Sequence, residues 1–226
     1  MKNTKQVLIL SVLAAAFTVA CAAGGNSNEL SSAELDALTA DIVAKDFHDK
    51  GIVKVEEAFA TDETIIACNA ADVAGKPLSD DEARRLEALN MATVKWPSDG
   101  RYLGDWELGE KIAQSGRGKT WTDKADTVNG GNCYNCHQIN KEELSFGTIG
   151  TSLYNYGKIR GVTDPNADDA NTKQWLEYTW AKIWNSKASN ACSNMPRAGH
   201  KGILSEDDIR HLMALLLDPN SPVNSD

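Results

Sequence analysis

The residues with the clearest chemistry are two cysteines and a histidine in the pentapeptide Cys133-Tyr134-Asn135-Cys136-His137. Two thiols at this spacing can each add to one vinyl group of the same porphyrin, which forms two thioether bonds. The histidine that follows is carried under the iron and can coordinate it through an imidazole nitrogen. The pentapeptide therefore predicts one covalently bound haem c, with Cys133 and Cys136 as anchors and His137 as an axial ligand.

Paired cysteines have two other common uses, and both fit this sequence less well. A zinc site would need a second pair of ligands at close spacing, whereas Cys68 and Cys192 are single and distant. A thioredoxin-like dithiol would lie between a strand and a helix, but the run Asn-Gly-Gly-Asn at 129–132 indicates a loop before Cys133. Zinc and a thiol redox pair remain the alternatives to haem.

A low-spin electron carrier needs a second axial ligand, and Met195 is the preferred candidate. It lies in a polar loop, residues 194–197, which has no helical or strand periodicity, so we expect no core for it to fill. It also lies far enough beyond His137 for the chain to return over the opposite face of the haem. A thioether leaves more positive charge on iron than imidazole or thiolate does, so Met195 would raise the reduction potential.

Other methionines, histidines and a cysteine are weaker candidates for this position. His200 shares the loop with Met195 and is the main rival. Met91 and Met213 each lie on the apolar face of a predicted helix, so we expect both to pack in the core. Cys192 could bind iron as a thiolate, but a disulfide is the preferred prediction for it. His211 is expected on the exposed side of the last helix, without a role.

Three helices are expected to enclose the haem. One spans Asp105 to about Gln114 and contains Gly109, which predicts close approach by another helix. The proposed partner is the last helix, which begins at Ser205 with Asp208 as capping partner and ends at 218–219. A third helix, about 171–185, carries apolar side chains at helical spacing, expected in the core and the haem wall. They are Leu176, Trp180, Ile183 and Trp184.

Two loops and two arginines complete the predicted site. Residues 147–153 should supply a backbone carbonyl that accepts a hydrogen bond from the second ring nitrogen of His137. Residues 115–132 form a polar, glycine-rich loop, which we expect Trp121 to anchor. Arg160 and Arg197 are the cations nearest to the haem-lining loops, where each either pairs with a haem propionate or is solvated.

The N-terminus predicts export. Residues 1–5 are basic, and the almost unbroken apolar run at 7–19 is too short to span a bilayer. We predict a signal peptide, residues 1–22, cleaved after Ala22, with lipidation of Cys21 as the alternative. Haem is attached to such motifs outside the cytoplasmic membrane, so we expect a periplasmic protein without a membrane span.

Two further cysteines remain once the haem motif and Cys21 are set aside. In an oxidising compartment, Cys68 and Cys192 are more often bridged than free. The disulfide would tie an N-terminal extension, residues 23–100, to the domain that follows. Within the extension we expect helices from Ser32 to about Lys50 and from Ser79, where Glu82 completes a capping pattern.

The charge balance limits the possible partners. The formal net charge of the whole chain is −9, and removal of residues 1–22 takes away two lysines and no acid, which makes it −11. An acidic surface disfavours binding to nucleic acid and to anionic membranes. It does not identify a partner.

Several segments of the chain resemble the SoxX family, the monohaem cytochrome c subunits of SoxAX complexes in bacterial thiosulfate oxidation. The resemblance covers about 85–220, and its motifs lie at 96–100 (Trp-Pro-Ser-Asp-Gly), 131–138 (the haem motif and its neighbours), 147–150 (Gly-Thr-Ile-Gly), 178–183 (Tyr-Thr-Trp-Ala-Lys-Ile) and 190–197 (Asn-Ala-Cys-Ser-Asn-Met-Pro-Arg). The combination is much more specific than the haem motif, which a very large number of cytochromes share.

The resemblance implies an all-α fold, with a class I cytochrome c-like domain at 101–226 after the N-terminal helical extension. It implies that Cys133 and Cys136 anchor one haem c and that His137 and Met195 are its axial ligands. SoxAX joins thiosulfate to a cysteine of the carrier protein SoxYZ, with the bond-forming chemistry in the SoxA subunit. A SoxX-like protein would be a non-catalytic subunit that passes the released electrons to a small cytochrome c. A free-standing electron shuttle is the alternative.

The sequence departs from the SoxX pattern at three positions. Thr151 stands where the family usually has proline, which would loosen the loop that orients His137. Ser189 and Ala198 stand where aromatic residues are usual, which would open the haem pocket to water and lower the reduction potential. These differences concern the potential and the stability, and leave the ligand set unchanged.

Overall fold

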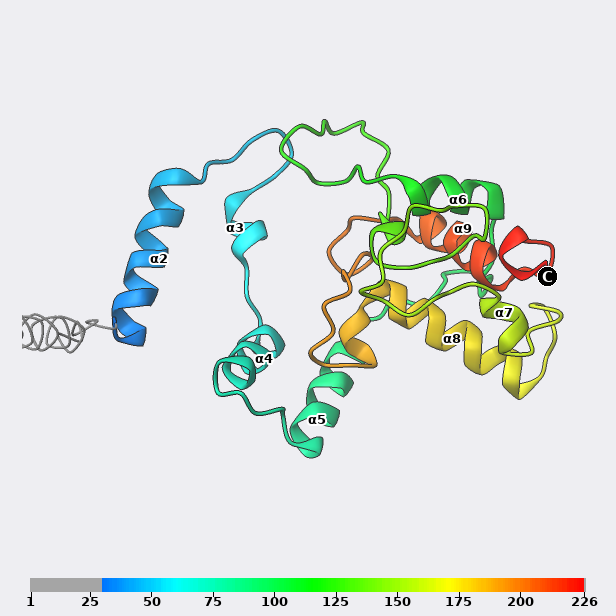
Figure 1. The fold of residues 1–226 in the computed structure, drawn as a ribbon, viewed down its shortest axis with the longest axis horizontal. Coiled ribbons are helices and arrows are strands. Elements are labelled where there is room, and N and C mark those ends of the chain that lie inside the picture. Colours follow the sequence, from blue (N-terminus) through cyan, green and yellow to red (C-terminus); the bar gives the residue numbers. More distant parts are fainter. Residues whose placement is uncertain (1–29, 226) are drawn as a thin grey trace, which may run out of the picture. The chain divides into compact units, whose positions relative to one another are not determined.

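The computed structural model describes residues 30–225, and Figure 1 shows their course. The chain divides into two compact units, Met1–His48 and Asp49–Asp226. The predicted signal peptide and Cys21 lie outside the described residues. Within 30–225 the regular structure is helical, apart from one isolated bridge between Lys50 and Val53. This confirms the predicted all-α class.

In the first unit, helix α2 spans Ser32–Asp46 and begins where the sequence predicted. Ser31 and Glu34 form a capping box, in which the hydroxyl accepts from the Glu34 N–H and the carboxylate accepts from the Ser31 N–H. The helix ends four residues earlier than expected. The apolar residues Leu35, Leu38 and Ile42 on it are exposed.

The second unit contains the remaining elements. They are α3 (Val55–Phe59), α4 (Glu63–Val73), α5 (Asp80–Met91), α6 (Trp106–Gln114), η1 (Cys133–Asn135), α7 (Tyr156–Ile159), α8 (Ala170–Trp184), η2 (Ser186–Ala188), α9 (Glu206–Leu217) and η3 (Pro222–Asn224). This unit includes residues on both sides of position 100, and its division into a helical extension and a cytochrome c domain stays a prediction.

Helices α6 and α9 cross in direct contact, as Gly109 predicted (Figure 1). A Cβ atom on Gly109 would overlap the carbonyl of His211 and lie 3.0 Å from the Cβ atom of Leu215. The capping box of Ser205 and Asp208 at the start of α9 is also confirmed. The expectation for His211 is wrong: it is half-buried, and its Nδ1 accepts a hydrogen bond of 2.9 Å from the Asp105 N–H at the start of α6.

Helix α8 supplies the centre of the core. All four of its predicted core residues are buried, and the Trp180 and Trp184 rings stack with 6.2 Å between their centroids. The Trp180 indole N–H donates to the Lys95 carbonyl at 2.8 Å, which satisfies its polar atom. Met213 is fully buried in α9, as expected.

Helices α4 and α5 join the same unit through polar side chains. The Asn90 amide of α5 donates to the Thr64 hydroxyl of α4 at 2.8 Å and accepts from the Asn185 amide at 3.1 Å. Because these groups are buried and paired, they fix how the segments pack. Ser79 caps α5 as predicted. Met91 was expected in the core, but it is 39% exposed, because α5 packs through one narrow face.

The segment between α5 and α6 is held against α9. The Ser98 N–H and hydroxyl both donate to Glu206, each at 2.9 Å, and Asp99 pairs with Arg210 at 2.7 Å. These contacts place the residues that lead into α6. None of the helices within 30–225 combines the length and the apolar character that a membrane span requires.

Candidate functional site

The haem motif forms a tight turn. Cys133–Asn135 is a single 3₁₀ turn, which Asn132 enters with a left-handed backbone (φ 50°). The amide groups of Cys136 and His137 both donate to the Cys133 carbonyl, at 3.1 and 2.9 Å. This turn brings the three predicted haem-binding side chains together. Both cysteine side chains are half-buried.

Tyr134, between the two cysteines, fastens the turn to α6. Its ring is buried, and its hydroxyl donates to the Glu110 carboxylate at 2.8 Å and accepts from the Asn140 N–H at 3.1 Å. Burial, together with the hydrogen bond to Glu110, raises the pKa of Tyr134, so the phenol stays a neutral donor. Sequence reasoning missed this anchor, because nothing local indicates which helix Tyr134 reaches.

The loop after the motif orients His137, as the sequence predicted. The Nδ1 atom of His137 lies 2.7 Å from the Thr151 carbonyl oxygen. A carbonyl can only accept, so Nδ1 carries the proton and Nε2 keeps its lone pair for a metal. The Gly150 N–H donates to the Cys136 carbonyl at 2.8 Å, which holds the loop beside the motif.

Two glycines allow this close approach. A Cβ atom on Gly150 would lie 2.7 Å from Nε2 of His137 and even closer to the rest of the ring. A Cβ atom on Gly131 would lie 2.8 Å from Sγ of Cys133. Any side chain at either position would push a predicted haem-binding group out of place.

The environment of Cys133 does not suit a thiol redox pair. Burial raises the pKa of its thiol to about 12. Reactive dithiols have a depressed pKa, because the thiolate is the nucleophile. Within the described residues, no group of three or more histidine, cysteine or acidic side chains is placed to hold a metal ion.

Met195 lies in a loop, as predicted, but its surroundings differ from the expectation. Its side chain is half-buried and packs against the main hydrophobic core, which Cys133 also borders. The segment is fixed by the Ser186 hydroxyl, which donates to the Met195 carbonyl at 2.6 Å. The rival His200 is exposed, and its N–H donates to the Trp184 carbonyl at 2.9 Å.

The two candidate arginines have different surroundings. Arg197 is buried and pairs with Asp62 at 2.6 Å. The Arg160 guanidinium lies 3.5 Å from the centre of the Tyr156 ring and 4.6 Å from that of Trp175. Its buried Nε, like Nε1 of Trp184, has no hydrogen-bond partner in the described part of the chain. An anionic group such as a haem propionate would satisfy such donors.

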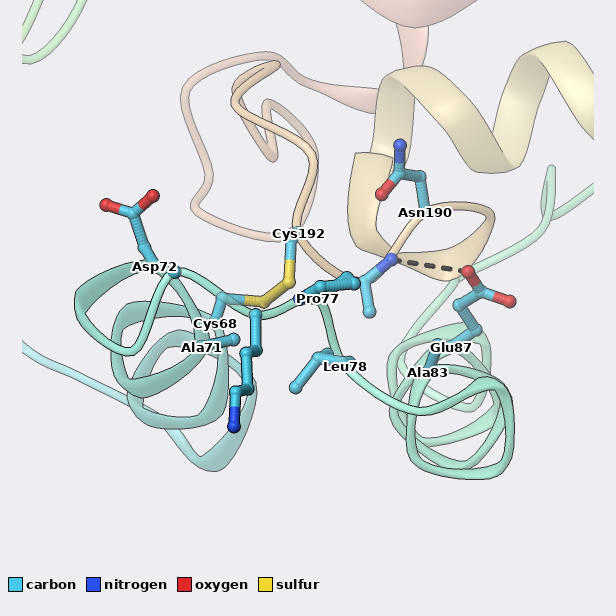
Figure 2. Close-up of a pocket in the computed structure, with 12 residues that line it drawn as sticks. Cys68, Ala71, Asp72, Pro77, Leu78, Ala83, Glu87, Asn190 and Cys192 are labelled. Atoms are coloured by element: carbon cyan, nitrogen blue, oxygen red, sulfur yellow. Dashed lines mark hydrogen bonds between the residues drawn. A yellow bond between two sulfur atoms is a disulfide. The ribbon is translucent and has the colours of Figure 1, made fainter.

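Two cavities lie outside the haem motif. One, of about 420 Å³, adjoins the predicted disulfide, Cys68–Cys192, which the structure contains (Figure 2). The other, of about 500 Å³, lies in the 115–132 loop. Trp121 does not anchor that loop and is 40% exposed. Buried Asp123 holds it instead by accepting from the N–H groups of Gly118 and Thr120, at 2.9 and 2.8 Å.

Comparison with known proteins agrees with this geometry. Residues 108–218 match the cytochrome c family. An uncharacterized lipoprotein of Aquifex aeolicus (strain VF5) is 36% identical over 134 residues, which are 59% of this chain and 59% of that protein. The match thus spans about three fifths of the relative's length. The family match supports a c-type cytochrome with covalently bound haem and a role in electron transfer.

The residues present fit a haem c. Within residues 30–225, the turn offers two thiols and an imidazole whose Nε2 keeps its lone pair, and both Cys133 and Met195 pack against the apolar core, the kind of surrounding that a porphyrin requires.

Proposed function

We propose that this protein is a SoxX-type monohaem cytochrome, the electron-transfer subunit of a SoxAX complex. In this role it accepts the electrons released when thiosulfate is joined to the SoxYZ carrier cysteine and passes them to a small cytochrome c. The observation that carries the electron-transfer part is the oriented His137 ring beside two thiols. The SoxX assignment rests on the sequence motifs around these residues.

Each residue has a distinct task in this proposal. Cys133 and Cys136 bind the haem covalently, and the haem supplies one iron centre that alternates between two oxidation states. His137 would be one ligand of the iron, and its hydrogen bond to Thr151 would make it a better ligand. Met195 would be the second ligand, and its thioether would raise the reduction potential. The surrounding core excludes water.

The proposed location is the periplasm, after export by the N-terminal segment. Cleavage after Ala22 gives a protein without an anchor, whereas acylation of Cys21 gives a tethered one. The Aquifex relative is described as a lipoprotein, which indicates a lipid anchor in that relative. Division of the chain at residue 100 into an extension and a cytochrome c domain belongs to the same proposal.

Reconstitution tests the proposal. The haem-loaded protein is mixed with a SoxA-type partner and SoxYZ, and haem reduction is followed spectroscopically after thiosulfate is added. We expect a stoichiometric complex and thiosulfate-dependent reduction that requires both partners. A monomer that reacts equally with many redox proteins, and shows no thiosulfate dependence, would instead establish the free-standing shuttle.

A further inference from the structure

Helix α4 holds the Met195 loop at two points. Cys68 of α4 forms the disulfide with Cys192, three residues before Met195. Asp62, the N-cap of α4, pairs at 2.6 Å with Arg197, two residues after Met195. The position of the loop therefore depends on α4 on both sides of the methionine.

The helix itself buries little. Thr64 is its one fully buried residue, whereas Ile66 is 60% and Val73 90% exposed. With little buried apolar surface, a short helix has low local stability and is held mainly by specific ties. One tie is covalent, the disulfide of Cys68. The other ties are polar: Asp62 pairs with Arg197, Glu63 pairs with Arg85, and Thr64 accepts a hydrogen bond from Asn90.

The disulfide is open to a reactant from the cavity beside it. Figure 2 shows the two sulfur atoms between α4 and the loop that carries Asn190. Both cysteines line the cavity of about 420 Å³, Cys192 is exposed and Cys68 is half-buried. Its wall combines small residues such as Ala71, Ala83 and Ala191 with the charged Asp72, Lys76 and Glu87, and its volume leaves room for a thiol-bearing group.

We propose that the Cys68–Cys192 disulfide is a thiol-exchange site that takes a dithiol reductant and controls the Met195 loop. A thiolate of the dithiol attacks Sγ of Cys192, the sulfur of the more exposed residue. A mixed disulfide forms, and Cys68 leaves as a thiolate and takes up a proton. The second thiol of the reductant then displaces Cys192, so the reductant loses two electrons and becomes a disulfide.

When the disulfide opens, the Asp62–Arg197 pair remains as the tie between α4 and the Met195 loop. The Met195 carbonyl keeps its hydrogen bond to Ser186, and Lys187 still donates to the Ala191 and Ser193 carbonyls, but the segment before Met195 loses its covalent tie to α4. The methionine then holds the iron less firmly. This second step rests on the proposed function, because it requires Met195 to be an axial ligand.

The first experiment measures exchange. The haem-loaded full-length protein is treated with dithiothreitol in native buffer, trapped with iodoacetamide and weighed by mass spectrometry, while circular dichroism monitors its helices. We expect both cysteines to be labelled with the helical signal intact. Labelling only after the helices are lost would overturn the exchange site.

Paired variants in α5 show whether the cavity is the route. Ala83 lines it, so Ala83→Phe fills it, whereas Ala88 is exposed on the same helix and does not line it. We expect slower labelling in Ala83→Phe and an unchanged rate in Ala88→Phe. Equal rates in the two variants would show that the reductant does not enter through the cavity.

The second experiment measures coupling to the haem. After alkylation the iron is reoxidised with ferricyanide, and the near-infrared sulfur-to-iron band is recorded. We expect the band to weaken or vanish, as also in the Cys68→Ser/Cys192→Ser variant. A band that persists in opened protein would overturn the coupling. A band missing before any treatment would instead refute Met195 ligation, and the labelling result would still stand.

Discussion

The His137 ring is held by a backbone that approaches it closely. Its Nδ1 atom donates to the Thr151 carbonyl, and Gly150 lies so close to the ring that a Cβ atom there would overlap it. SoxX proteins usually have proline at the position of Thr151, but the hydrogen bond uses only the backbone carbonyl, which every residue has. The departure at Thr151 therefore leaves this contact in place.

Substitution of Gly150 tests this contact. In Gly150→Ala the new methyl group overlaps the ring, so His137 must move, at a cost of about 1–3 kcal/mol. We expect less haem per protein and loss of the low-spin spectrum. Gly116→Ala is the control, because its Cβ atom would meet Asn132 at an ordinary 3.5 Å. An unchanged spectrum in Gly150→Ala would contradict the role given to the loop.

Removal of the Met195 thioether tests the sixth ligand. Met195→Ala should lose the near-infrared sulfur-to-iron band, lower the reduction potential, and let carbon monoxide bind the reduced protein. Met91→Ala, which truncates a 39% exposed methionine, should change none of these. Ready binding of carbon monoxide by the unmodified protein would point to an open iron site and a different class of haem protein.

At the scale of single residues, the sequence predicted the loop that orients His137 better than it predicted which side chains are buried. The haem-binding role of the two thiols and of His137 stays a prediction from residue types and spacing, whereas the contact of His137 with the following loop is confirmed. Met91, Trp121 and His211 were placed incorrectly, because burial depends on which segments pack there. The half-buried side chain of Met195 was missed for the same reason.

Among the elements, the crossing of α6 and α9 is the contact that sequence reasoning predicted best. A glycine in the middle of a helix lowers the stability of that helix. Its presence in α6 therefore indicated that another helix approaches closely at that position. The absence of a side chain lets the backbone of α9 approach, down to the carbonyl of His211.

The variant Gly109→Ala separates packing from helix propensity. The higher helix propensity of alanine should stabilise the protein by about 1 kcal/mol. The overlap of its methyl group with α9 should destabilise the protein by more than this, so we expect the free energy of unfolding to fall by about 1–3 kcal/mol in total. The exposed control Ala88→Gly should lose about 1 kcal/mol from propensity alone. Chemical denaturation measures both free energies of unfolding, and a more stable Gly109→Ala would contradict the packing.

The tie between α4 and the Met195 loop should depend on pH. Burial tends to raise the pKa of Asp62, but hydrogen bonds from the Ile65 N–H and from Arg197 outweigh this and lower it. A lowered folded-state pKa stabilises the fold above the ordinary Asp value of about 3.9, and the contribution is lost as pH falls below it.

The variant Asp62→Asn tests this dependence. It leaves Arg197 buried without its charge partner, so the free energy of unfolding should fall by about 1–3 kcal/mol at neutral pH. The difference from the unmodified protein should shrink as the pH drops through and below about 4. Asp72→Asn removes an exposed charge from the same helix as a control. A difference that does not change with pH would contradict the ion pair.

For the molecule as a whole, composition and cysteine count were informative. Counting the cysteines left outside the haem motif predicted the disulfide between Cys68 and Cys192, which are 124 residues apart. Local patterns could not predict the polar network around Asn90, the Asp62–Arg197 pair or the cavity beside the disulfide. Each of these joins segments distant in sequence, so only the tertiary fold shows them.

The measurement that tests the central claim most directly is the intact mass and absorption spectrum of the matured protein. We predict the mass of the chain plus one haem, attached at Cys133 and Cys136, and a low-spin spectrum with the sulfur-to-iron band. A Cys133→Ser/Cys136→Ser variant should carry no covalent haem. A matured protein without Soret absorbance, or with free thiols at both positions, would contradict the claim.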